Sequence, residues 1–468
     1  MGSIKHLSSK KPEQYYKDGN KFYDLGQYAK AVASYDKAIA IDPDHANVWN
    51  NRGVALRKLG RHTESLDSCN KAIAVKPDLA VAWNNCGEAQ YNLGMYTEAV
   101  ASYEKAINIK PDFADAWYNS GFALGKLGRY AEAMDSYDKV IAIDPNYAIA
   151  WYNRGFTLVE LERYVEAVDS YDKAIAIDPN DADIWHSHGI ALYELGQYTE
   201  SLASFDKAIA IDSNDGVIWY NNGLTLGNLE RYKEALASYD KAIAIDSNNT
   251  AALNNRGVML NKLGLREEAL VSYDNLIAIN PDYAPAWCNR GNVLYNLRRY
   301  AEAVDAYDKA IGIDPDFPMA WYNRGIALRI LRRYKKAIAS FDKANAIDSN
   351  DADVWHARGN ALYNLRRYAE TVDSFEKAIA INPNDAKIWL NYGAALSDLK
   401  RYQESLASYD KAIAIKPDYD AAWYNRGILL VKLKQYADAV ASYDKAIAID
   451  PNYASAIKNR EKALKKLI

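Results

Sequence analysis

Residues 148–181 read AIAWYNRGFTLVELERYVEAVDSYDKAIAIDPND, and the pattern in this stretch decides the fold. The eleven tryptophans of the chain all repeat the position of Trp151, and their sequence numbers differ by 34 or by twice 34. We call each position that lies a multiple of 34 residues from Trp151 a grid point. A glycine stands four residues after each grid point from Tyr15 to Trp423, as Gly155 does here, and no insertion or deletion interrupts the period. The sequence therefore predicts a tandem array whose units bury their apolar faces against their neighbours.

Each unit is predicted to form two helices. In the quoted stretch, Trp151, Gly155 and Leu158 recur at helical spacing, and Tyr164 starts a second stripe after a break. Pro179 ends the second helix. Three units lack this proline and carry a serine, a residue type typical of helix caps, in its place: Ser213, Ser247 and Ser349. The repeated glycine indicates close helix contact, because glycine inside a helix costs about 1 kcal/mol relative to alanine.

These positions resemble the tetratricopeptide repeat (TPR) family over all but about the first eleven residues. One unit carries the full signature at Trp423, Gly427, Leu430, Tyr436, Ala439, Tyr443, Ala446 and Pro451. The resemblance implies an all-α fold, a right-handed α-solenoid superhelix of 34-residue helix-turn-helix repeats. We expect a flexible N-terminal tail over residues 1–11, thirteen tandem repeats forming one solenoid over residues 12–453, and a C-terminal capping helix over residues 454–468.

Composition narrows the partners and the compartment. The net charge of -4, from 57 basic and 61 acidic residues, gives no bias toward nucleic acid or acidic membranes. No apolar run approaches the ~18 residues of a membrane span, and the N-terminus lacks the apolar core of a signal peptide. Cys69, Cys86 and Cys288 have neither disulfide-framework nor metal-ligand spacing. We therefore expect a cytoplasmic protein that is not inserted in a membrane.

The sequence offers little for catalysis or cofactor binding. His186 and His188 are two residues apart on a predicted helix, so their rings point in different directions, and we interpret them as polar residues of the helix surface. The glycines recur at a fixed phase and form no phosphate-binding loop. Carboxylates recur in near-identical strings, which indicates solvated faces and helix ends. We expect no enzyme activity, no metal and no cofactor.

Asparagine recurs two residues after the grid point, on the face of the first helix opposite the Trp, Gly and Leu positions. Asparagine is about 0.5 kcal/mol worse than alanine in a helix, so its repetition runs against local propensity. This asparagine ladder consists of Asn51, Asn85, Asn119, Asn153, Asn221, Asn255, Asn289, Asn323, Asn391, Asn425 and Asn459. Lys17, Ser187 and Ala357 interrupt it.

Two explanations of the ladder compete. Either one unit that carried asparagine was duplicated, with the amides bonding between neighbouring helices, or the amides bind the backbone of an extended peptide. We favour the second explanation. The ladder resembles that of the superhelical TPR domain of O-linked N-acetylglucosamine transferase, which holds substrate polypeptide; the catalytic domain of that enzyme has no counterpart in this sequence. The resemblance implies that the first helices line a concave groove.

Aromatic and apolar residues accompany the ladder. Tyrosines stand beside the rungs at Tyr118, Tyr152, Tyr220, Tyr322 and Tyr424, and apolar residues lie one turn on at Phe122, Phe156, Ile190, Leu224, Ile326 and Ile428. Rigid aromatic rings with a polar tip suit protein recognition. The alternative interpretation is that these side chains pack between adjacent first helices.

The turns between the two helices of a unit change along the chain. Earlier units have Gly26, Gly60, Gly94, Gly128 or Gly196 there, which suits a left-handed helix cap. Later units carry basic residues: Arg298, Arg299, Arg332, Arg333, Lys335, Lys336, Arg366, Arg367, Lys400 and Arg401. We call this series the basic edge; it is either a solvated face or a docking edge for an acidic partner.

The sequence thus predicts a non-catalytic protein-interaction scaffold that binds extended polypeptide segments in a concave groove, through the asparagine ladder and the tyrosines. One alternative is a helical-repeat RNA-binding protein, which the period of 34, the abundant tryptophan and the nearly neutral groove oppose. Another is the interaction subunit of an enzyme assembled in trans.

Overall fold

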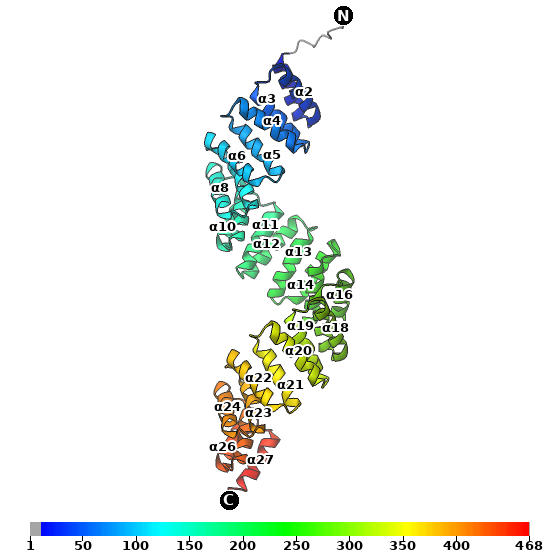
Figure 1. Cartoon of the computed structure of the whole chain (residues 1–468), viewed down its shortest axis with the longest axis vertical. Helices are drawn as coiled ribbons and strands as arrows, with labels where there is room; N and C mark the ends of the chain where they lie inside the picture. The colour runs from blue at the N-terminus through cyan, green and yellow to red at the C-terminus, as the bar shows by residue number, and fades with distance from the viewer. Residues whose placement is uncertain (1–10, 468) are drawn as a thin grey trace. The chain divides into compact units, whose positions relative to one another are not determined.

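The helix pair is the building block of the fold, and the computed structural model describes residues 11–467 as a succession of such pairs (Figure 1). The chain divides into two compact units, the first ending at Ile245 and the second beginning at Asp246. We describe each unit by itself, so the single solenoid over residues 12–453 stays a prediction. The predicted N-terminal tail lies, except for Lys11, outside the described residues.

The helices of the two units follow the predicted phase. In unit 1 the first helices of the repeats are α1 (Pro12–Asp24), α3 (Ala46–Lys58), α5 (Ala80–Asn92), α7 (Ala114–Lys126), α9 (Ala148–Glu160), α11 (Ala182–Glu194) and α13 (Gly216–Asn228). The second helices of unit 1 are α2 (Tyr28–Ile41), α4 (His62–Val75), α6 (Tyr96–Ile109), α8 (Tyr130–Ile143), α10 (Tyr164–Ile177), α12 (Tyr198–Ile211) and α14 (Tyr232–Ile245).

Unit 2 continues the alternation. Its first helices are α15 (Thr250–Lys262), α17 (Ala284–Asn296), α19 (Pro318–Ile330), α21 (Ala352–Asn364), α23 (Ala386–Asp398) and α25 (Asp420–Lys432). Its second helices are α16 (Arg266–Ile279), α18 (Tyr300–Ile313), α20 (Tyr334–Ile347), α22 (Tyr368–Ile381), α24 (Tyr402–Ile415) and α26 (Tyr436–Ile449). The final helix, α27 (Ala454–Leu464), packs on α26 at the place predicted for the cap. The all-α solenoid of helix pairs is confirmed.

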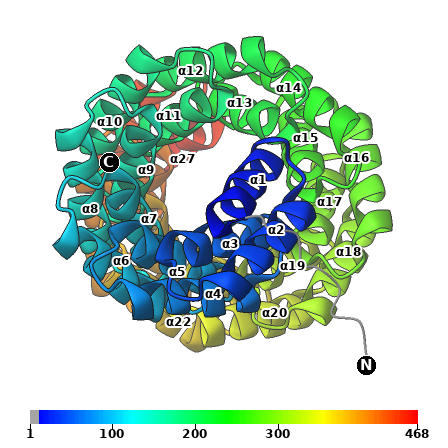
Figure 2. The same cartoon turned by 90° about the horizontal axis from the view of Figure 1, so that it is seen from above.

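Curvature places the first helices on the inner side of each unit. Within each unit, each helix packs against its neighbours in the chain, and in addition a first helix contacts the next first helix, as α3 contacts α5 and α17 contacts α19. Among the described residues of either unit, no second helix contacts the next second helix in this way. Seen from above, α7, α9, α11 and α13 of unit 1 lie inside α8, α10, α12 and α14, and α15 and α17 of unit 2 lie inside α16 and α18 (Figure 2). The first helices therefore form a concave surface in each unit.

The repeated glycine allows the two helices of a repeat to approach closely. A Cβ atom on Gly155 would lie 2.7 Å from Cε1 of Tyr171, which is fully buried on the second helix. In the repeat that has Cys69 in place of this aromatic residue, a Cβ atom on Gly53 would lie 2.7 Å from the Cys69 Sγ atom. The predicted packing role of the glycine is confirmed.

Every tryptophan bonds to the turn that precedes its helix. The indole nitrogen of Trp151 donates to the carbonyl oxygen of Pro145 at 3.0 Å, and all eleven tryptophans make the equivalent bond six residues back. Where serine replaces the proline, the carbonyl still accepts, as Ser213 does from Trp219 at 3.0 Å. The indole thus anchors each first helix to the end of the preceding repeat.

The interpretation of the three serines as helix caps is wrong. The capping residue stands two positions later in each case: Asp215 caps α13, Asn249 caps α15 and Asp351 caps α21. A cap must lie immediately before the helix so that its side chain reaches the free N–H groups of the first turn. The serines are too far back for that.

The turn inside each repeat contains one residue in the left-handed region. The predicted left-handed glycines are confirmed, for example Gly128 at φ +70°. The basic residues that replace glycine adopt the same backbone, with φ of +62° at Arg298 and +57° at Arg332. A residue with a Cβ atom is strained there, so the basic edge is built at a cost in backbone energy.

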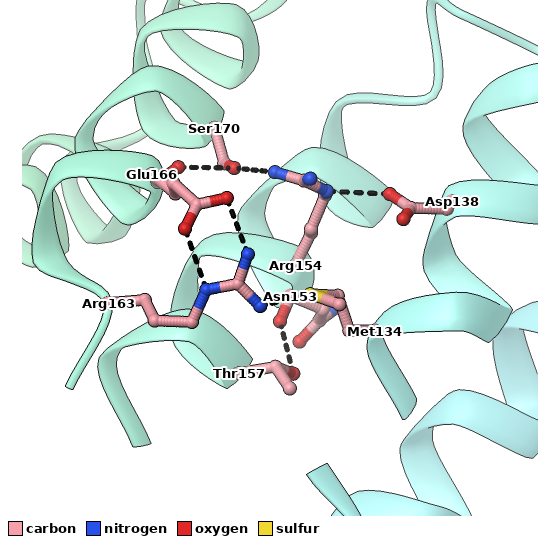
Figure 3. Close-up of polar contacts among 8 residues, drawn as sticks. All are labelled: Met134, Asp138, Asn153, Arg154, Thr157, Arg163, Glu166 and Ser170. Atoms are coloured by element: carbon pink, nitrogen blue, oxygen red, sulfur yellow. Dashed lines mark hydrogen bonds and ion pairs between the residues drawn. The ribbon is translucent and has the colours of Figure 1, made fainter. Parts of the chain in front are cut away.

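Arginines on the first helices tie successive second helices together (Figure 3). Arg154 on α9 donates from Nε to the Asp138 carboxylate on α8 at 2.7 Å, and from Nη1 to the Ser170 hydroxyl on α10 at 2.6 Å. Carboxylates that we interpreted as solvated faces thus take part in contacts between repeats.

His186 and His188 are not polar residues of the helix surface, so our interpretation of this pair is wrong. His188 is buried and its Nδ1 lies 2.9 Å from the Ser204 hydroxyl oxygen, while Nε2 of His186 lies 2.8 Å from Nδ2 of Asn221. The first helix of the repeat is covered by the second helix on one side and by the next first helix on another. Both faces of a first helix are therefore partly enclosed.

Candidate functional site

The asparagine ladder runs along the first helices on the concave side of each unit. Its side chains are half-buried in most repeats, and Asn85 is buried. They are thus more enclosed than the helical periodicity indicated. The reason is that consecutive first helices lie close enough for side chains two residues after the grid point to touch the preceding repeat.

The ladder amides form hydrogen bonds between repeats. Asn153 donates from Nδ2 to the Tyr118 hydroxyl at 3.2 Å, and Asn85 donates to Oδ1 of Asn50 at 2.8 Å. The partner lies 35 residues earlier in the chain for Asn51, Asn85, Asn119, Asn153, Asn221, Asn289, Asn391 and Asn459. The nitrogens of these amides therefore bond between neighbouring helices, as the first of the two explanations of the ladder predicts.

Some rungs use a second acceptor five residues after the grid point of the preceding repeat. Asn323 donates to Oδ1 of Asn292 at 2.9 Å, and Asn119 donates to the Glu88 carboxylate at 3.2 Å. Where that position is apolar, as at Phe122, this acceptor is lost. The residue at this position therefore controls how the next rung is held.

A pocket opens beside the ladder between α7, α8 and α9. It has a volume of about 490 Å³, and Phe122, Tyr137, Asn153 and Phe156 line it together with Tyr152. Phe122 and Phe156 are 41% and 49% exposed, so the apolar wall is open to solvent. The pocket combines an apolar floor with the polar edge of one rung.

The same pocket recurs at the repeat period. Its four positions at Phe122, Tyr137, Asn153 and Phe156 reappear two, five and nine repeats later. The recurrences have volumes of about 150, 250 and 420 Å³. Their lining sets are Ile190, Phe205, Asn221 and Leu224; Asn292, Tyr307, Asn323 and Ile326; and Ile428, Tyr443, Asn459 and Lys462. Each pocket has one ladder asparagine on its wall.

The tyrosines beside the rungs pack against the second helix of their own repeat. The ring of Tyr118 lies 6.1 Å from that of Tyr137, and Tyr152 lies 6.0 Å from Tyr171. Tyr220, Tyr322 and Tyr424 make the equivalent contacts. Burial raises the pKa of the Tyr118 and Tyr322 hydroxyls. These rings fill the space between helices, and Tyr152 also lines the pocket in unit 1.

Sequence reasoning missed the contribution of the second helices to the groove. Tyr137, Phe205, Tyr307 and Tyr443 line the pockets although we interpreted the aromatic residue of the second helix only as part of the signature. The signal that could have found them is the repeated glycine, because the ring packs directly against it and so lies against the first helix that carries the groove.

Three arginines of the basic edge are paired with glutamates of the same repeat. Arg299, Arg367 and Arg401 each contact a glutamate three residues on, at 2.6, 2.5 and 2.6 Å. Arg333 has Lys336 at that position instead of a glutamate. The repeat that contains α19 and α20 therefore carries a concentrated positive charge.

Other classes of site find no support in the part of the chain that the structure describes. No group of three or more His, Cys, Asp or Glu side chains in residues 11–467 could hold a metal ion. In the same residues, no helix is both long enough and apolar enough to span a bilayer.

Comparisons with known proteins agree with the repeat geometry. Models described as tetratricopeptide repeat match residues 46–79, 114–147, 148–181, 170–203, 217–249, 284–317, 318–351, 356–420 and 421–453. A model described as TPR repeat matches residues 19–60, 92–128, 189–230 and 259–297. No curated protein matched the sequence.

Several solved structures resemble the chain. YrrB, described as a TPR protein with an unusual peptide-binding site, is 24% identical over 40% of this chain and 97% of its own, with a TM-score of 0.37. The APC/C hetero-tetramer Cut9–Hcn1 is 14% identical over 98% and 97%, with a TM-score of 0.42. Yeast Tom70 is 14% identical over 90% and 96%, with a TM-score of 0.39.

Proposed function

Since the chain belongs to the tetratricopeptide repeat family, we propose that it is a non-catalytic scaffold whose concave groove binds extended segments of other proteins. The observation that carries the proposal is the recurring pocket. A side-chain pocket that returns in register with the repeats, each time beside one asparagine, suits a linear chain whose side chains and backbone are contacted in turn.

The two roles of the asparagines are compatible. A carboxamide has two N–H donors and an oxygen with two lone pairs. A nitrogen that bonds to the preceding repeat holds the side chain in one orientation, and the oxygen remains an acceptor for a peptide N–H group. We therefore propose that Asn153, Asn221, Asn323 and Asn459 grip main chain from the pocket walls, and that the other rungs do so at the same positions of their repeats.

The tyrosines and apolar residues supply the rest of the binding energy. Phe122 and Phe156 present exposed rings, and burial of such a side chain by a ligand contributes about 1.5 to 3 kcal/mol. Tyr152 places a polar tip at the same pocket. Apolar side chains of a bound segment are expected to occupy the pocket between α7 and α9.

Backbone methylation tests the role of the rungs directly. A 15-residue peptide is selected on the purified protein from a randomised display library, labelled with fluorescein and titrated by anisotropy. Copies methylated at single backbone nitrogens lack one N–H donor each. Methylation opposite a rung should weaken binding by about 0.5 to 1.5 kcal/mol, and changing all four pocket asparagines to alanine should remove this difference between methylated and unmethylated peptide.

Ala357, where the asparagine ladder is interrupted, offers a matched control for the asparagine variants. Ala357→Asn adds a rung where the ladder has none, so it should tighten binding of a peptide that spans this repeat. If no peptide is enriched, or if methylation is tolerated at every position, the groove does not bind main chain. Salt-sensitive binding of single-stranded RNA that is lost in the same asparagine variants would favour the RNA-binding alternative instead.

A second candidate function is docking of an acidic partner on the basic edge from Arg298 to Arg401. The replacement of glutamate by Lys336 favours it, because it leaves Arg333 without the partner that its counterparts have. Lys336→Glu restores the missing carboxylate and should weaken binding of poly-L-glutamate. Equal binding by the variant and the original protein would contradict docking at this edge.

A further inference from the structure

Two places in the groove, eight repeats apart, differ in the charge of a single position. In unit 1, Arg57 on α3 reaches across to Glu88 on α5, with 2.5 Å between Nη2 and Oε2. Arg329 on α19 occupies the position of Arg57 eight repeats later, and the residue at the position of Glu88 is Asn360 on α21. Unit 2 therefore has the arginine of this pair without its carboxylate.

The hydrogen bonds to the next rung correspond at the two places, although Asn84 of unit 1 is replaced by His356 in unit 2. Asn119 donates to Oε1 of Glu88 at 3.2 Å, and Asn391 donates to Oδ1 of Asn360 at the same distance. Asn119 also donates to Asn84, and Asn391 contacts Nε2 of His356, the counterpart of Asn84. The exchange of Glu88 for Asn360 thus preserves the hydrogen bond to the next rung and removes only the charge.

Arg329 lacks a carboxylate partner among the described residues. Its Nε is buried and has no hydrogen-bond partner in the protein, as is also true of Nε in Arg57. The two arginines therefore differ in charge pairing, because only Arg57 has a carboxylate at Nη2. An unpaired guanidinium in a partly desolvated position is costly, and an incoming carboxylate would relieve that cost.

The register of Arg329 places it in the groove. It stands eight residues after its grid point, the position of Tyr193 and Tyr295, which both line recurring pockets. It lies near enough to Tyr322 and His356 for its charge to lower the pKa of both groups, although burial has the larger effect on each. These neighbours belong to α19 and α21, and α21 is the helix that carries the ladder gap.

The ladder gap lies at this place. In unit 1 the rung beside Arg57 is Asn85, which bonds to Asn50. Its counterpart in unit 2 is Ala357, which is buried and has no polar side chain, and Tyr322 stands at the position of Asn50. At Ala357 the ladder has no asparagine that could bind main chain, and beside it the groove carries Arg329, an arginine without a carboxylate partner in residues 11–467.

We propose that Arg329, with His356 and Asn360 beside it, forms a subsite that binds the carboxylate of an aspartate or glutamate side chain in the bound segment. This inference rests on the proposed binding of extended polypeptide and adds to it one position at which the sequence of the segment is read. The guanidinium supplies paired N–H donors to the two carboxylate oxygens. Charge complementarity selects an acidic side chain over a neutral one.

The test uses three synthetic twelve-residue peptides labelled with fluorescein. The first alternates Ser and Glu and has an amidated C-terminus; the second replaces Glu by Gln; the third is the Gln peptide with a free C-terminal carboxylate. The Glu peptide should bind the full-length protein about tenfold more tightly than the amidated Gln peptide, and the difference should shrink as salt is added.

Four variants locate the site. Arg329→Gln removes the charge, and Asn360→Glu supplies an internal carboxylate in the geometry of the Arg57 pair; each should abolish the preference for the Glu peptide. Arg57→Gln combined with Glu88→Gln is the matched control and should leave the preference unchanged, because it removes a pair that is already neutral. Glu88→Asn should create a second acidic subsite in unit 1 and strengthen binding of the Glu peptide. Circular dichroism and urea unfolding verify that each variant is folded.

Several outcomes would overturn the inference. Undiminished preference for the Glu peptide in both Arg329→Gln and Asn360→Glu would do so, and so would loss of the preference in Lys336→Glu alone, which would place the acidic ligand on the basic edge. Equal binding of the third peptide and the Glu peptide would assign the subsite to a chain terminus. If peptides selected from the display library still bind in these cases, only the acidic subsite fails and the proposed groove function stands.

Discussion

Asn153 and Tyr118 form a hydrogen bond between consecutive repeats, with 3.2 Å between the amide nitrogen of Asn153 on α9 and the hydroxyl oxygen of Tyr118 on α7. Tyr152 occupies the position of Tyr118 one repeat later, and there Ser187 stands in place of the rung. Two tyrosines in equivalent positions therefore differ in whether a ladder amide donates to them.

This pair predicts unequal effects of the same substitution. Tyr118→Phe removes one of two acceptors of the half-buried Asn153 amide, which keeps its bond to the Ile149 carbonyl oxygen at 2.9 Å. It should reduce the free energy of unfolding by about 1 kcal/mol. Tyr152→Phe removes no ladder bond and should change it by less than about 0.5 kcal/mol. Urea unfolding followed by circular dichroism measures both; equal losses would show that the bond contributes nothing to the contact between repeats.

The glycines of α17 and α18 predict opposite effects of alanine. Gly291→Ala places a Cβ atom 2.5 Å from Cε1 of the buried Tyr307, so the variant should be less stable by about 1 to 3 kcal/mol. Gly312→Ala meets nothing within 4 Å and improves helix propensity, so it should stabilise by up to about 1 kcal/mol. Thermal unfolding of the two variants beside the original protein checks the sign of each change.

The positive φ of the turn residues predicts that glycine in place of a basic residue of the edge stabilises the protein. Arg332 has φ +57°, where a Cβ atom costs about 1 to 2 kcal/mol and glycine costs nothing. After the greater entropy of glycine in the unfolded chain is subtracted, Arg332→Gly should stabilise by about 0.5 to 1 kcal/mol. Gly128→Arg is the reverse exchange and should destabilise by a similar amount. A destabilising Arg332→Gly would mean that the arginine makes a contact worth more than the strain.

The histidines predict that stability falls as the solution is acidified. Burial lowers the pKa of His186, His188 and His356 below the ordinary value of 6.5, with nearby aspartates opposing it. The unfolded chain then binds more protons than the folded one, so stability is lost as the pH falls below about 6.5 and levels off below the folded pKa. Because carboxylates also titrate near pH 5, the comparison is between the original protein and the triple His→Gln variant. The variant should lose less stability between pH 7 and pH 5.

The last helix predicts the consequence of a truncation. Ala456 and Ala463 of α27 are buried against Leu430 and Tyr443, so deletion of residues 454–468 uncovers the apolar side of α25 and α26. Hydrogen exchange of the backbone near Tyr443 should become faster, and the truncated chain should associate. A monomeric truncation with unchanged protection would contradict the capping role of α27.

Much of the fold could be predicted from the sequence because its determinants repeat with the chain. The period of 34 placed the helices, and the bounds of α9 and α10 agree with it. Gly155 predicted the close contact between the two helices of its repeat, and Gly128 predicted the left-handed turn residue. These features depend on the backbone of one repeat and on its contact with an identical neighbour, so a single repeat carries the information for all of them.

The interior of the groove could be predicted only in outline. Helical periodicity placed Asn153 on the side away from the core, but the structure decided that its nitrogen is bonded to Tyr118. It also decided that Tyr137 of the second helix shares a pocket with it. Each of these contacts joins side chains of different helices. Their formation depends on the distance between those helices, which cannot be predicted from the repeat period.

The two arginines show the same division between what the sequence determines and what tertiary structure adds. The sequence alone places Arg57 and Arg329 at one phase of the repeat and makes Glu88 and Asn360 differ. Only the tertiary structure brings Arg57 within 2.5 Å of Glu88 and so reveals that Arg329 lacks a counterpart. The physical reason is range: hydrogen bonding within a helix joins neighbouring turns and follows the local sequence, whereas a charge in the groove is paired or unpaired according to a side chain on the next first helix.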